Sequence, residues 1–541
     1  MPTADEFTAL KQALDEATRR SEQAVQRNDS LVGELRMVRT ERDLLLEQLN
    51  KFKRQLFAAK SEAGATNQKD MFFNEAEMLG MTAEPAVEEG GDDQHSVDVP
   101  GHERKLKSKR GRKPLDPALS REVVRHELPQ AERVCPHDGA VLQEISVEVT
   151  EQLDIIPQQV RVIRHERVKY ACPCCDGGLR LAAKPQQVIP KGLFTESLLA
   201  WVITSKYMDG LPLYRQAALL SRFGGTDLSR NTMSSSVMRV GQAVQPIINL
   251  LRDRLLEAPL IYGDETEIQV LKEAGRKAQT KSYMWAQMTE GSGAAGSGPP
   301  IRLFAYTPSR STEASLRLYA GVSHGSVLMT DGYEPYNQVA KTGRLVHLAC
   351  WAHCRRYFND ALQALPKDKR GPEQVTVQFM DLIGKLYHVE SVARQERLDA
   401  NALTMRREER SLPVLNKIKA LVLAKLHTVA PNTLLGKALH YAQGQWLKLE
   451  RFVANGNYPI DNNGCENSIR PFVIGRRNWL FADTVAGAHA SANLYSLLQT
   501  CKVNRIDGFQ YLRQLLIALP KAQTADDFDA LLPWTIDLAS A

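Results

Sequence analysis

Two aspartates lie in surroundings that favour a shared metal ion. Asp264 is in the middle of a mostly apolar segment, 259–270, and Asp331 is near the end of another, 326–332. Both segments have the length and composition of β-strands. Because neighbouring carboxylates among apolar residues repel each other, we expect a cation between them. Oxygen-only ligands of this kind suit Mg²⁺ or Mn²⁺.

A third carboxylate is expected from a helix later in the chain. Glu466, in the segment Asp461-Asn-Asn-Gly-Cys-Glu-Asn467, is the candidate. Arg470 and Arg477 lie on the same face of that helix as Glu466. A metal-binding carboxylate followed on its own face by arginines suits a phosphodiester substrate.

The segments around these acids predict a mixed α/β sheet. Strand patterns recur at 259–270, 283–288, 301–306, 326–332 and 344–351. Three strands followed by alternating strands and helices is the order of an RNase H-like α/β fold. In that order the first strand is central and the fourth lies beside it, so Asp264 and Asp331 would be neighbours.

The region before the sheet, 191–254, is expected to be helical. One helix follows Gly210, and after a glycine turn a second helix starts near Arg230, with Ser229 as its N-cap. This pattern is typical of a helix-turn-helix, in which Arg230 would contact DNA. A helical hairpin without DNA-binding function has the same pattern.

Cysteines in residues 116–190 predict a zinc ribbon. Cys172-Pro-Cys-Cys175 has the spacing that lets two sulfurs bind one ion, and strand-like residues at 147–170 precede it. In the earlier segment Cys135-Pro-His-Asp138, an aspartate stands where a second cysteine would be expected. A ribbon that has lost its metal is the alternative. The expected ligands of a structural Zn²⁺ are Cys135, His137 or Asp138, Cys172 and Cys175.

A second group of histidines and cysteines is in the segment His347-Leu-Ala-Cys-Trp-Ala-His-Cys354. It lacks a fourth ligand at a useful spacing, so we expect these residues to pack in the core. The arginines that follow, Arg355 and Arg356, are expected to face DNA.

The N-terminal residues 7–56 carry a heptad repeat. Leu35 and Leu49 are among its a positions, Leu31 and Leu45 among its d positions, and no proline interrupts it. A lone helix cannot bury such a stripe, so we expect a coiled-coil homodimer. A helix packed on the body of its own chain is the alternative.

Residues 61–115 form a linker in which the sign of the charge reverses. Acidic residues dominate 84–98, and basic residues dominate 104–113. The basic part resembles an AT-hook, which inserts into a narrow minor groove of DNA. A solvated basic tether is the alternative, and either form would contact phosphates. The residues expected at the DNA are Lys109, Arg110, Arg112 and Lys113.

Composition excludes several classes of protein. The chain has 541 residues, 43% of them apolar and 24% charged, which suits several globular domains. The net charge of +6 does not identify a DNA-binding protein by itself. No segment reaches the roughly 18 apolar residues of a membrane helix, and no secretory signal is visible. Eight cysteines in so long a chain exclude a disulfide scaffold, so we expect a cytoplasmic protein with reduced thiols.

Several segments taken together resemble the transposases of the bacterial insertion sequence 66 family. The resemblance extends over nearly the whole chain and implies a DDE triad of Asp264, Asp331 and Glu466. It also implies a helical insertion before the glutamate, at 366–455. The segments that carry it are Tyr262-Gly-Asp-Glu-Thr266, Thr330-Asp-Gly-Tyr-Glu-Pro-Tyr336, 347–356, 461–471 and Arg476-Arg-Asn-Trp-Leu-Phe481.

The resemblance implies that the protein binds the terminal inverted repeats of an insertion sequence and joins its ends to target DNA. Water cuts the end, and the freed 3′-hydroxyl then attacks the target, with two Mg²⁺ or Mn²⁺ ions per active site. Arg470, Arg476 and Arg477 are expected at the double-stranded DNA. Accessory proteins of the same element are further expected partners, membranes are not, and the location is the bacterial nucleoid.

Two alternatives remain open on the sequence alone. An inactive or domesticated transposase would bind DNA without cutting it. A nuclease or resolvase on the same fold would not need so long a region for recognising the element's ends.

The expected architecture is an α/β RNase H-like catalytic core with a helical insertion, preceded by a coiled coil, a zinc-ribbon-like module and a helical DNA-binding region. The expected boundaries are 1–60 for the coiled coil, 61–115 for the linker, 116–190 for the ribbon, 191–254 for the DNA-binding helices, 255–365 for the first part of the core, 366–455 for the insertion, 456–490 for the glutamate helix and 491–541 for a C-terminal helical domain.

Overall fold

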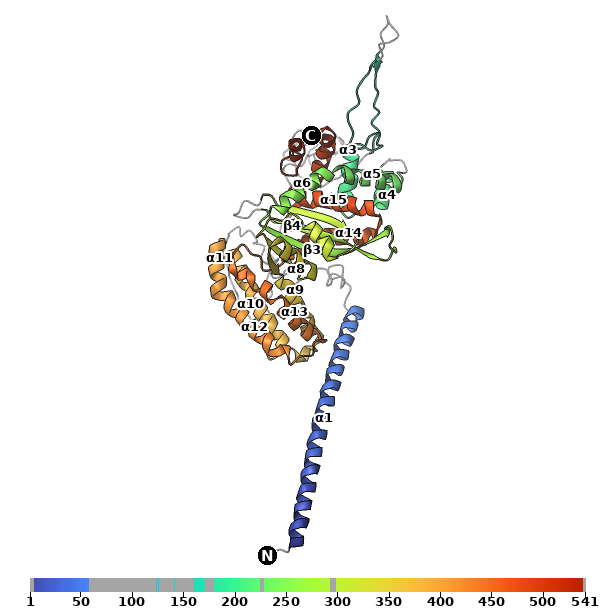
Figure 1. The fold of residues 1–541 in the computed structure, drawn as a ribbon. Coiled ribbons are helices and arrows are strands. Elements are labelled where there is room, and N and C mark those ends of the chain that lie inside the picture. Colours follow the sequence, from blue (N-terminus) through green and yellow to red (C-terminus); the bar gives the residue numbers. More distant parts are fainter. Residues whose placement is uncertain are drawn as a thin grey trace. The chain divides into compact units, whose positions relative to one another are not determined.

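The computed structural model describes residues 4–57, 160–170, 180–223, 228–291 and 298–538, together with 123, 125 and 141. The chain divides into two compact units. The first contains Met1–Glu84, Ile163–Arg222 and Thr226–Ala541, and the second contains Pro85–Val162 and Phe223–Gly225. Every helix and strand of the described residues belongs to the first unit (Figure 1).

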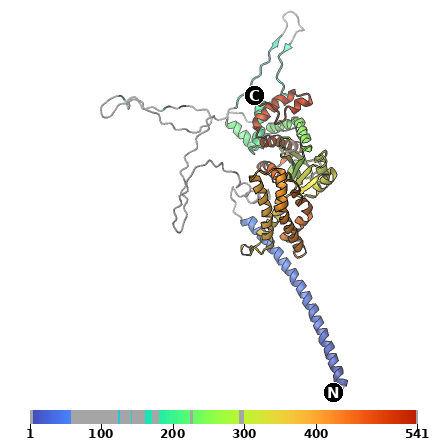
Figure 2. The ribbon, with the colours of Figure 1, turned by 90° about the vertical axis from the view of Figure 1, so that its left-hand side faces the viewer.

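The N-terminal heptads form one continuous helix, α1 (Ala4–Phe57), of 54 residues (Figure 2). Its predicted apolar stripe faces solvent in the single chain, since Leu31, Leu35, Leu45 and Leu49 are each about half exposed. The predicted helix is therefore confirmed. Such a stripe still needs a second apolar surface to cover it.

A six-stranded mixed sheet forms the centre of the first unit. The strand order is β5-β4-β3-β6-β7, and β8 pairs with the far end of β3. Strands β4 and β5 run antiparallel to their neighbours, whereas β6, β7 and β8 are parallel to theirs. The bounds are β3 (Leu260–Lys272), β4 (Lys281–Thr289), β5 (Ile301–Thr307), β6 (Val327–Thr330), β7 (Val346–Ala349) and β8 (Ala482–Thr484).

The five predicted strands of this sheet are all present, with the first one central and the fourth beside it. The sixth, β8, was not expected, because three residues between two helices carry no periodicity. Of the strand-like segment predicted at 147–170, the described residues 160–168 carry no strand. At the end of that segment, β1 (Lys169–Tyr170) pairs with β2 (Arg180–Leu181).

Helices before the sheet confirm the prediction for 191–254. Ser229 caps α5 as expected, because its Oγ accepts a hydrogen bond from the Asn231 backbone N–H at 3.2 Å. The helices are α3 (Glu196–Tyr207), α4 (Leu213–Arg222), α5 (Arg230–Ala243) and α6 (Gln245–Leu256).

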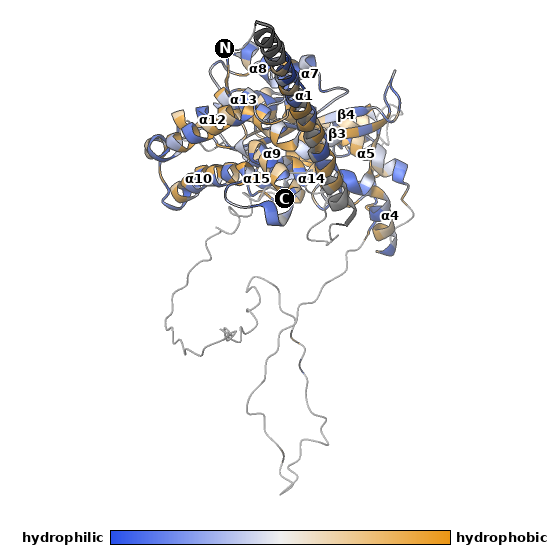
Figure 3. Ribbon diagram, turned by 90° about the horizontal axis from the view of Figure 1, so that it is seen from below, coloured by the Kyte–Doolittle hydropathy of each residue, from blue (hydrophilic) through white to orange (hydrophobic). Residues whose placement is uncertain are grey.

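Helix α7 connects β5 to β6, and α8 connects β6 to β7. Helix α9 follows β7, and the helices expected at 366–455 come after it. The core of this insertion is apolar, with the rings of Phe358 and Phe379 stacked 4.1 Å apart. Hydrophobic residues recur along these helices (Figure 3). The helices are α7 (Thr312–Leu318), α8 (Glu334–Gly343), α9 (Trp351–Ala364), α10 (Val375–Gln395), α11 (Ala400–Arg406), α12 (Leu412–Leu426) and α13 (Leu434–Leu449).

The last helices are α14 (Asn463–Trp479), α15 (Val485–Val503), α16 (Gly508–Ala518) and α17 (Ala525–Asp529). Helix α15 covers the edge of the sheet that β5 forms. Hydroxyls of Ser496 and Thr500 accept hydrogen bonds from the backbone N–H groups of Phe304 and Arg302, at 2.7 and 3.1 Å. These bonds satisfy an edge strand that would otherwise present unpaired donors. The domain boundary expected between residues 490 and 491 falls inside α15, a single helix that packs against the sheet.

None of the described helices is long and apolar enough to cross a membrane.

Candidate active site

The sheet register brings Asp264 and Asp331 together. Strands β3 and β6 are parallel neighbours, and Tyr262 pairs with Met329. Asp264 is two residues further along β3, and Asp331 is the first residue after β6, so that its charge acts on Asp264. Adjacent strands lie about 4.8 Å apart, so the predicted juxtaposition of the two carboxylates is present.

The backbone after β6 holds Asp331 in place. Its Oδ1 accepts a hydrogen bond from the Tyr333 backbone N–H at 2.9 Å, and its carbonyl accepts one from the Tyr441 hydroxyl. Gly332 has a φ of 97°, and a Cβ there would lie 2.9 Å from Cδ of Gln445. A side chain at this position would therefore be strained by the positive φ and would displace the end of the Gln445 side chain on α13.

Glu466 reaches the site because Asn462 anchors the start of α14. The Asn462 side chain donates to the Gly263 carbonyl at 3.0 Å, next to Asp264. Its backbone N–H donates to the sulfur of Cys350 at 3.2 Å. Because Glu466 is in the first turn of the same helix, these two bonds fix where its side chain lies. Only 3% of Glu466 is exposed.

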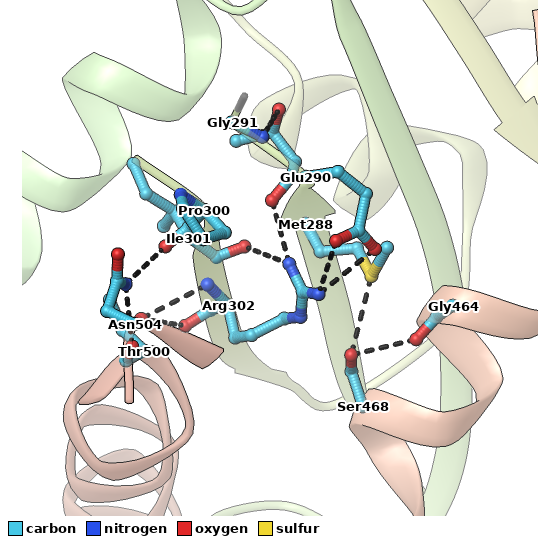
Figure 4. Close-up of polar contacts among 11 residues, drawn as sticks. Met288, Glu290, Gly291, Pro300, Ile301, Arg302, Gly464, Ser468, Thr500 and Asn504 are labelled. Atoms are coloured by element: carbon cyan, nitrogen blue, oxygen red, sulfur yellow. Dashed lines mark hydrogen bonds and ion pairs between the residues drawn. The ribbon is translucent and has the colours of Figure 1, made fainter. Parts of the chain in front are cut away.

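A small residue lets α14 approach the sheet closely (Figure 4). A Cβ at Gly464 would lie 2.9 Å from Cε of Met288 and 3.0 Å from a carboxylate oxygen of Glu290. That carboxylate is held by the buried guanidinium of Arg302, which donates to both of its oxygens at 3.0 Å. The same guanidinium donates to the Thr289 carbonyl at 2.7 Å. The base of the β4–β5 hairpin thus forms a fixed surface under the helix that carries Glu466.

The electrostatics of the site favour a cation. Burial raises the pKa of Asp264 well above its usual range, and the charges of Glu265, Asp331 and Glu466 raise it further. Asp264 Oδ1 accepts from the Glu265 backbone N–H at 2.8 Å, but its buried Oδ2 has no hydrogen-bond partner among the described residues. Burial also raises the pKa of Asp331. A hard divalent ion would relieve this repulsion and use the unpartnered oxygen, so these residues fit Mg²⁺ or Mn²⁺.

A fourth carboxylate, Glu265, follows Asp264 in β3. Side chains alternate along a strand, so Glu265 is expected on the opposite face of the sheet from Asp264 and outside the triad. Its carboxylate is nonetheless buried, accepts a hydrogen bond from the Tyr336 hydroxyl at 2.8 Å and lies 3.8 Å from Arg310. Burial, followed by the charge of Asp331, raises the pKa of Glu265 to about 7. The Asp-Glu doublet was the only signal in the sequence.

Cys350 and His353 lie beside Glu466. Nδ1 of His353 is 3.1 Å from Oε1 of Glu466, and one ligand atom from each of the three residues lies within 4.8 Å of the others. The predicted burial of the two residues is confirmed. The partner that the sequence did not reveal is Glu466, which is more than 100 residues away in the chain.

The chain also matches models of known protein families. The model of the Transposase IS66 family matches residues 191–490, more than half of the chain. The chain belongs to this family. Three further models match: the zinc-finger binding domain of transposase IS66 at 132–176, the IS66 C-terminal element at 496–534, and Transposase C of IS166 homeodomain at 44–124.

Similar proteins occur in Sinorhizobium fredii (strain NBRC 101917 / NGR234). Uncharacterized protein y4qI is 33% identical over 408 residues, covering 74% of this chain and 73% of that protein. Uncharacterized protein y4jD is 30% identical over 409 residues, covering 74% of this chain and 78% of that protein. Uncharacterized protein y4hP is 26% identical over 438 residues, covering 80% and 78%. The predicted membership of an IS66 transposase family is thus confirmed.

The arginines predicted to contact DNA differ in their exposure. Arg230 and Arg477 are exposed, whereas Arg356, Arg470 and Arg476 are partly buried. Nη1 of Arg476 lies 3.4 Å from Oγ1 of Thr266 on β3. Arg355, which was also predicted to contact DNA, is 8% exposed, because it is in the part of α9 that packs inward.

Two predicted groups lie outside the described residues. They are the zinc ligands Cys135, His137, Asp138, Cys172 and Cys175, and the AT-hook-like residues Lys109, Arg110, Arg112 and Lys113. All five zinc ligands are within the segment matched by the zinc-finger model.

Proposed function

We propose that this IS66-family protein is a DDE transposase that binds the terminal inverted repeats of its element, cuts the DNA there and joins the ends to target DNA. The observation that carries the proposal is the convergence of Asp264, Asp331 and Glu466 from β3, the end of β6 and α14 into one buried site. The strand order, with β3 central and β6 beside it, supports an RNase H-like core.

Asp264, Asp331 and Glu466 would hold the divalent ions, two Mg²⁺ or Mn²⁺ per active site in this proposal. When bound, such ions lower the pKa of water and stabilise charge on phosphate oxygens. A structural Zn²⁺ would be held by Cys135, Cys172, Cys175 and either His137 or Asp138. The zinc-finger match over 132–176 supports that assignment.

The chain's own residues orient the carboxylates and keep bulk water away. The Glu265 backbone N–H holds Asp264 Oδ1 and thereby directs Oδ2, while the Tyr333 backbone N–H orients Asp331. With a pKa near 7, Glu265 is partly protonated at neutral pH, which limits the negative charge beside Asp331.

Water is the first nucleophile in the proposed reaction, and the 3′-hydroxyl that it frees is the second. No protein nucleophile is required, and the nearby tyrosines are poorly suited to be one. Tyr336 is fully buried and its hydroxyl donates to Glu265, while the Tyr333 hydroxyl donates to the Arg310 carbonyl. Burial raises the pKa of Tyr336 well above its usual range. Both tyrosines therefore act as packing and hydrogen-bonding residues.

DNA would be bound by arginines at several places: Arg230 on α5, Arg356 on α9, and Arg470, Arg476 and Arg477 on α14. The basic linker segment and a homodimer formed through α1 would add affinity for the two ends of one element. Accessory proteins of the element are proposed further partners. A DNA substrate implies a protein that acts at the bacterial nucleoid, in the cytoplasm.

A strand-transfer assay tests the proposal. Labelled element ends, target DNA and Mg²⁺ are incubated with the wild type, Asp331→Ala and Glu466→Ala. Glu313→Ala is the matched control, because that carboxylate is exposed and pairs with Arg317 at the surface. We expect Mg²⁺-dependent joined product with the wild type and the control, and none with the other two variants. Specific end binding with no cleavage by any of the four proteins, even with the element's accessory proteins added, would favour a protein that only binds DNA.

A further inference from the structure

Cys350, His353 and Glu466 form a compact cluster of unlike ligand types next to the proposed active site. Cys350 is the N-cap residue of α9 and His353 is in its first turn, so the spacing Cys-x-x-His places both on one side of the helix start. Glu466 comes from the first turn of α14. All three are at least nine-tenths buried.

The histidine has an unused ring nitrogen. Nδ1 of His353 has no hydrogen-bond partner in the part of the chain that the structure describes, although it lies 3.1 Å from the Glu466 carboxylate. Neutral imidazole nitrogens are common metal ligands.

A second buried histidine, His347, has the hydrogen bonding that is usual for a histidine in a protein core. His347 is equally buried, but its Nε2 lies 2.9 Å from the Thr330 hydroxyl and is satisfied by it. The polar groups of buried histidines are normally paired in this way. His353 departs from that rule at the point where a cysteine and a carboxylate converge.

The sulfur of Cys350 is held in place by a backbone donor. It accepts a hydrogen bond from the Asn462 backbone N–H at 3.2 Å and sits at the N-terminus of a 14-residue helix. Donors of this kind orient the ligands of metal sites and tune them. Binding of a metal would replace the thiol proton, which would leave to solvent.

We propose that Cys350, His353 and Glu466 bind a zinc-like divalent cation, with the fourth position open. Sulfur, nitrogen and oxygen ligands favour Zn²⁺, whereas Mg²⁺ prefers oxygen ligands alone. Glu466 is shared between this cluster and the proposed Mg²⁺ site. Zinc bound to the cluster withdraws the glutamate from the DDE triad and inhibits strand transfer. This last consequence rests on the proposed function, whereas the binding itself does not.

Cobalt counting tests the binding. The full-length protein is stripped with a chelator, loaded with Co²⁺, and assayed for bound ions per chain and for absorption from cobalt–thiolate bonds. The substitutions Cys172→Ser and Cys175→Ser are present throughout to remove the proposed ribbon site. We expect cobalt–thiolate absorption from one ion per chain in this background, retained with Cys354→Ser and lost with Cys350→Ser or His353→Gln. Cobalt bound by the oxygen ligands of the DDE site gives no such absorption. Cys354 is a matched control, because it is a buried cysteine of the same helix outside the cluster.

Equal cobalt–thiolate absorption in all four proteins, or no such absorption in any of them, would overturn the proposal. Circular dichroism and thermal unfolding confirm that each variant is folded, and His353→Gln provides a second variant if Cys350→Ser is not. A zinc titration of strand transfer at fixed Mg²⁺ tests the consequence. If zinc binds without inhibiting strand transfer, the proposed competition between the zinc cluster and the DDE triad is wrong. Absence of strand transfer at any zinc concentration would count against the proposed function, while the cobalt count still decides the metal site.

Discussion

At the scale of single residues, the buried carboxylates of the site repel one another. Asp264 is 5% exposed, has one carboxylate oxygen without a partner among the described residues, and lies near three other acids. A buried carboxylate in such surroundings is tolerated for function at a cost in stability. Asp264 is therefore expected to destabilise the fold whenever no cation is bound.

Asp264→Asn should stabilise the metal-free protein, and more so as the pH rises. The raised pKa means that the folded chain keeps a proton that the unfolded chain releases near pH 4, so wild-type stability falls as the pH rises above 4. The slope is about 1.4 kcal/mol per pH unit until the folded pKa is reached. Asparagine does not titrate and keeps the hydrogen bond from the Glu265 backbone.

Thermal unfolding in EDTA at pH 5 and pH 8 measures this effect. We expect the gain of Asp264→Asn over wild type to be larger at pH 8, and Mg²⁺ to raise the Tm of the wild type alone. The control is Asp381→Asn, which removes an exposed carboxylate paired with Lys385. The same gain at both pH values would refute the assigned direction of the pKa shift.

At the scale of elements, one residue ties three parts of the site together through its side chain and its backbone N–H. Asn462 joins the start of α14 to β3 through the Gly263 carbonyl and to the start of α9 through the Cys350 sulfur. The position of Glu466 depends on these bonds more than on the helix itself.

Asn462→Ala should lower both stability and metal affinity. It leaves the buried Gly263 carbonyl without its partner, which costs about 1–3 kcal/mol in the free energy of unfolding. It also frees Glu466 to move away from Asp264. Urea unfolding with and without Mg²⁺ reports both effects, with exposed Asn457→Ala as the control. If Mg²⁺ stabilised Asn462→Ala as much as the wild type, the anchoring role would be wrong.

Close packing of α5 against α15 depends on Gly241. A Cβ there would lie 2.5 Å from Cβ and 2.6 Å from Cα of Ala490, and a backbone atom cannot give way as a flexible side chain can. Gly241→Ala should therefore lower the free energy of unfolding by about 1–3 kcal/mol.

A helical glycine with open space provides the control for this overpacking. Gly384 in α10 has no atom within 4 Å of a built Cβ, so Gly384→Ala should raise stability by up to about 1 kcal/mol through helix propensity. Urea unfolding of both variants checks the pair. A stabilised Gly241→Ala would show that the two helices are not so tightly packed.

At the scale of the whole molecule, periodicity made the sheet and its two aspartates predictable. Apolar segments around Asp264 and Asp331 indicated strands, and the strand order placed them side by side. Periodicity does not report which distant helix covers a sheet edge, so the role of α15 at β5 and the short β8 were missed. Likewise Glu265 and the contact of His353 with Glu466 depend on chain turns and tertiary packing, which leave no local pattern.

The apolar stripe of α1 leads to the last prediction, which concerns assembly. Leu31 and Leu45 occupy d positions and are about half exposed in the single chain, as expected if a second copy covers them. Replacing both with aspartate removes about 1.5–3 kcal/mol of apolar burial per leucine and should weaken dimerisation at least tenfold for each. Gln26→Asp, at an outward f position of the same helix, should leave the dimer intact. Sedimentation equilibrium of the full-length proteins distinguishes these outcomes, and a double variant that sediments as the same dimer as the wild type would place the interface elsewhere.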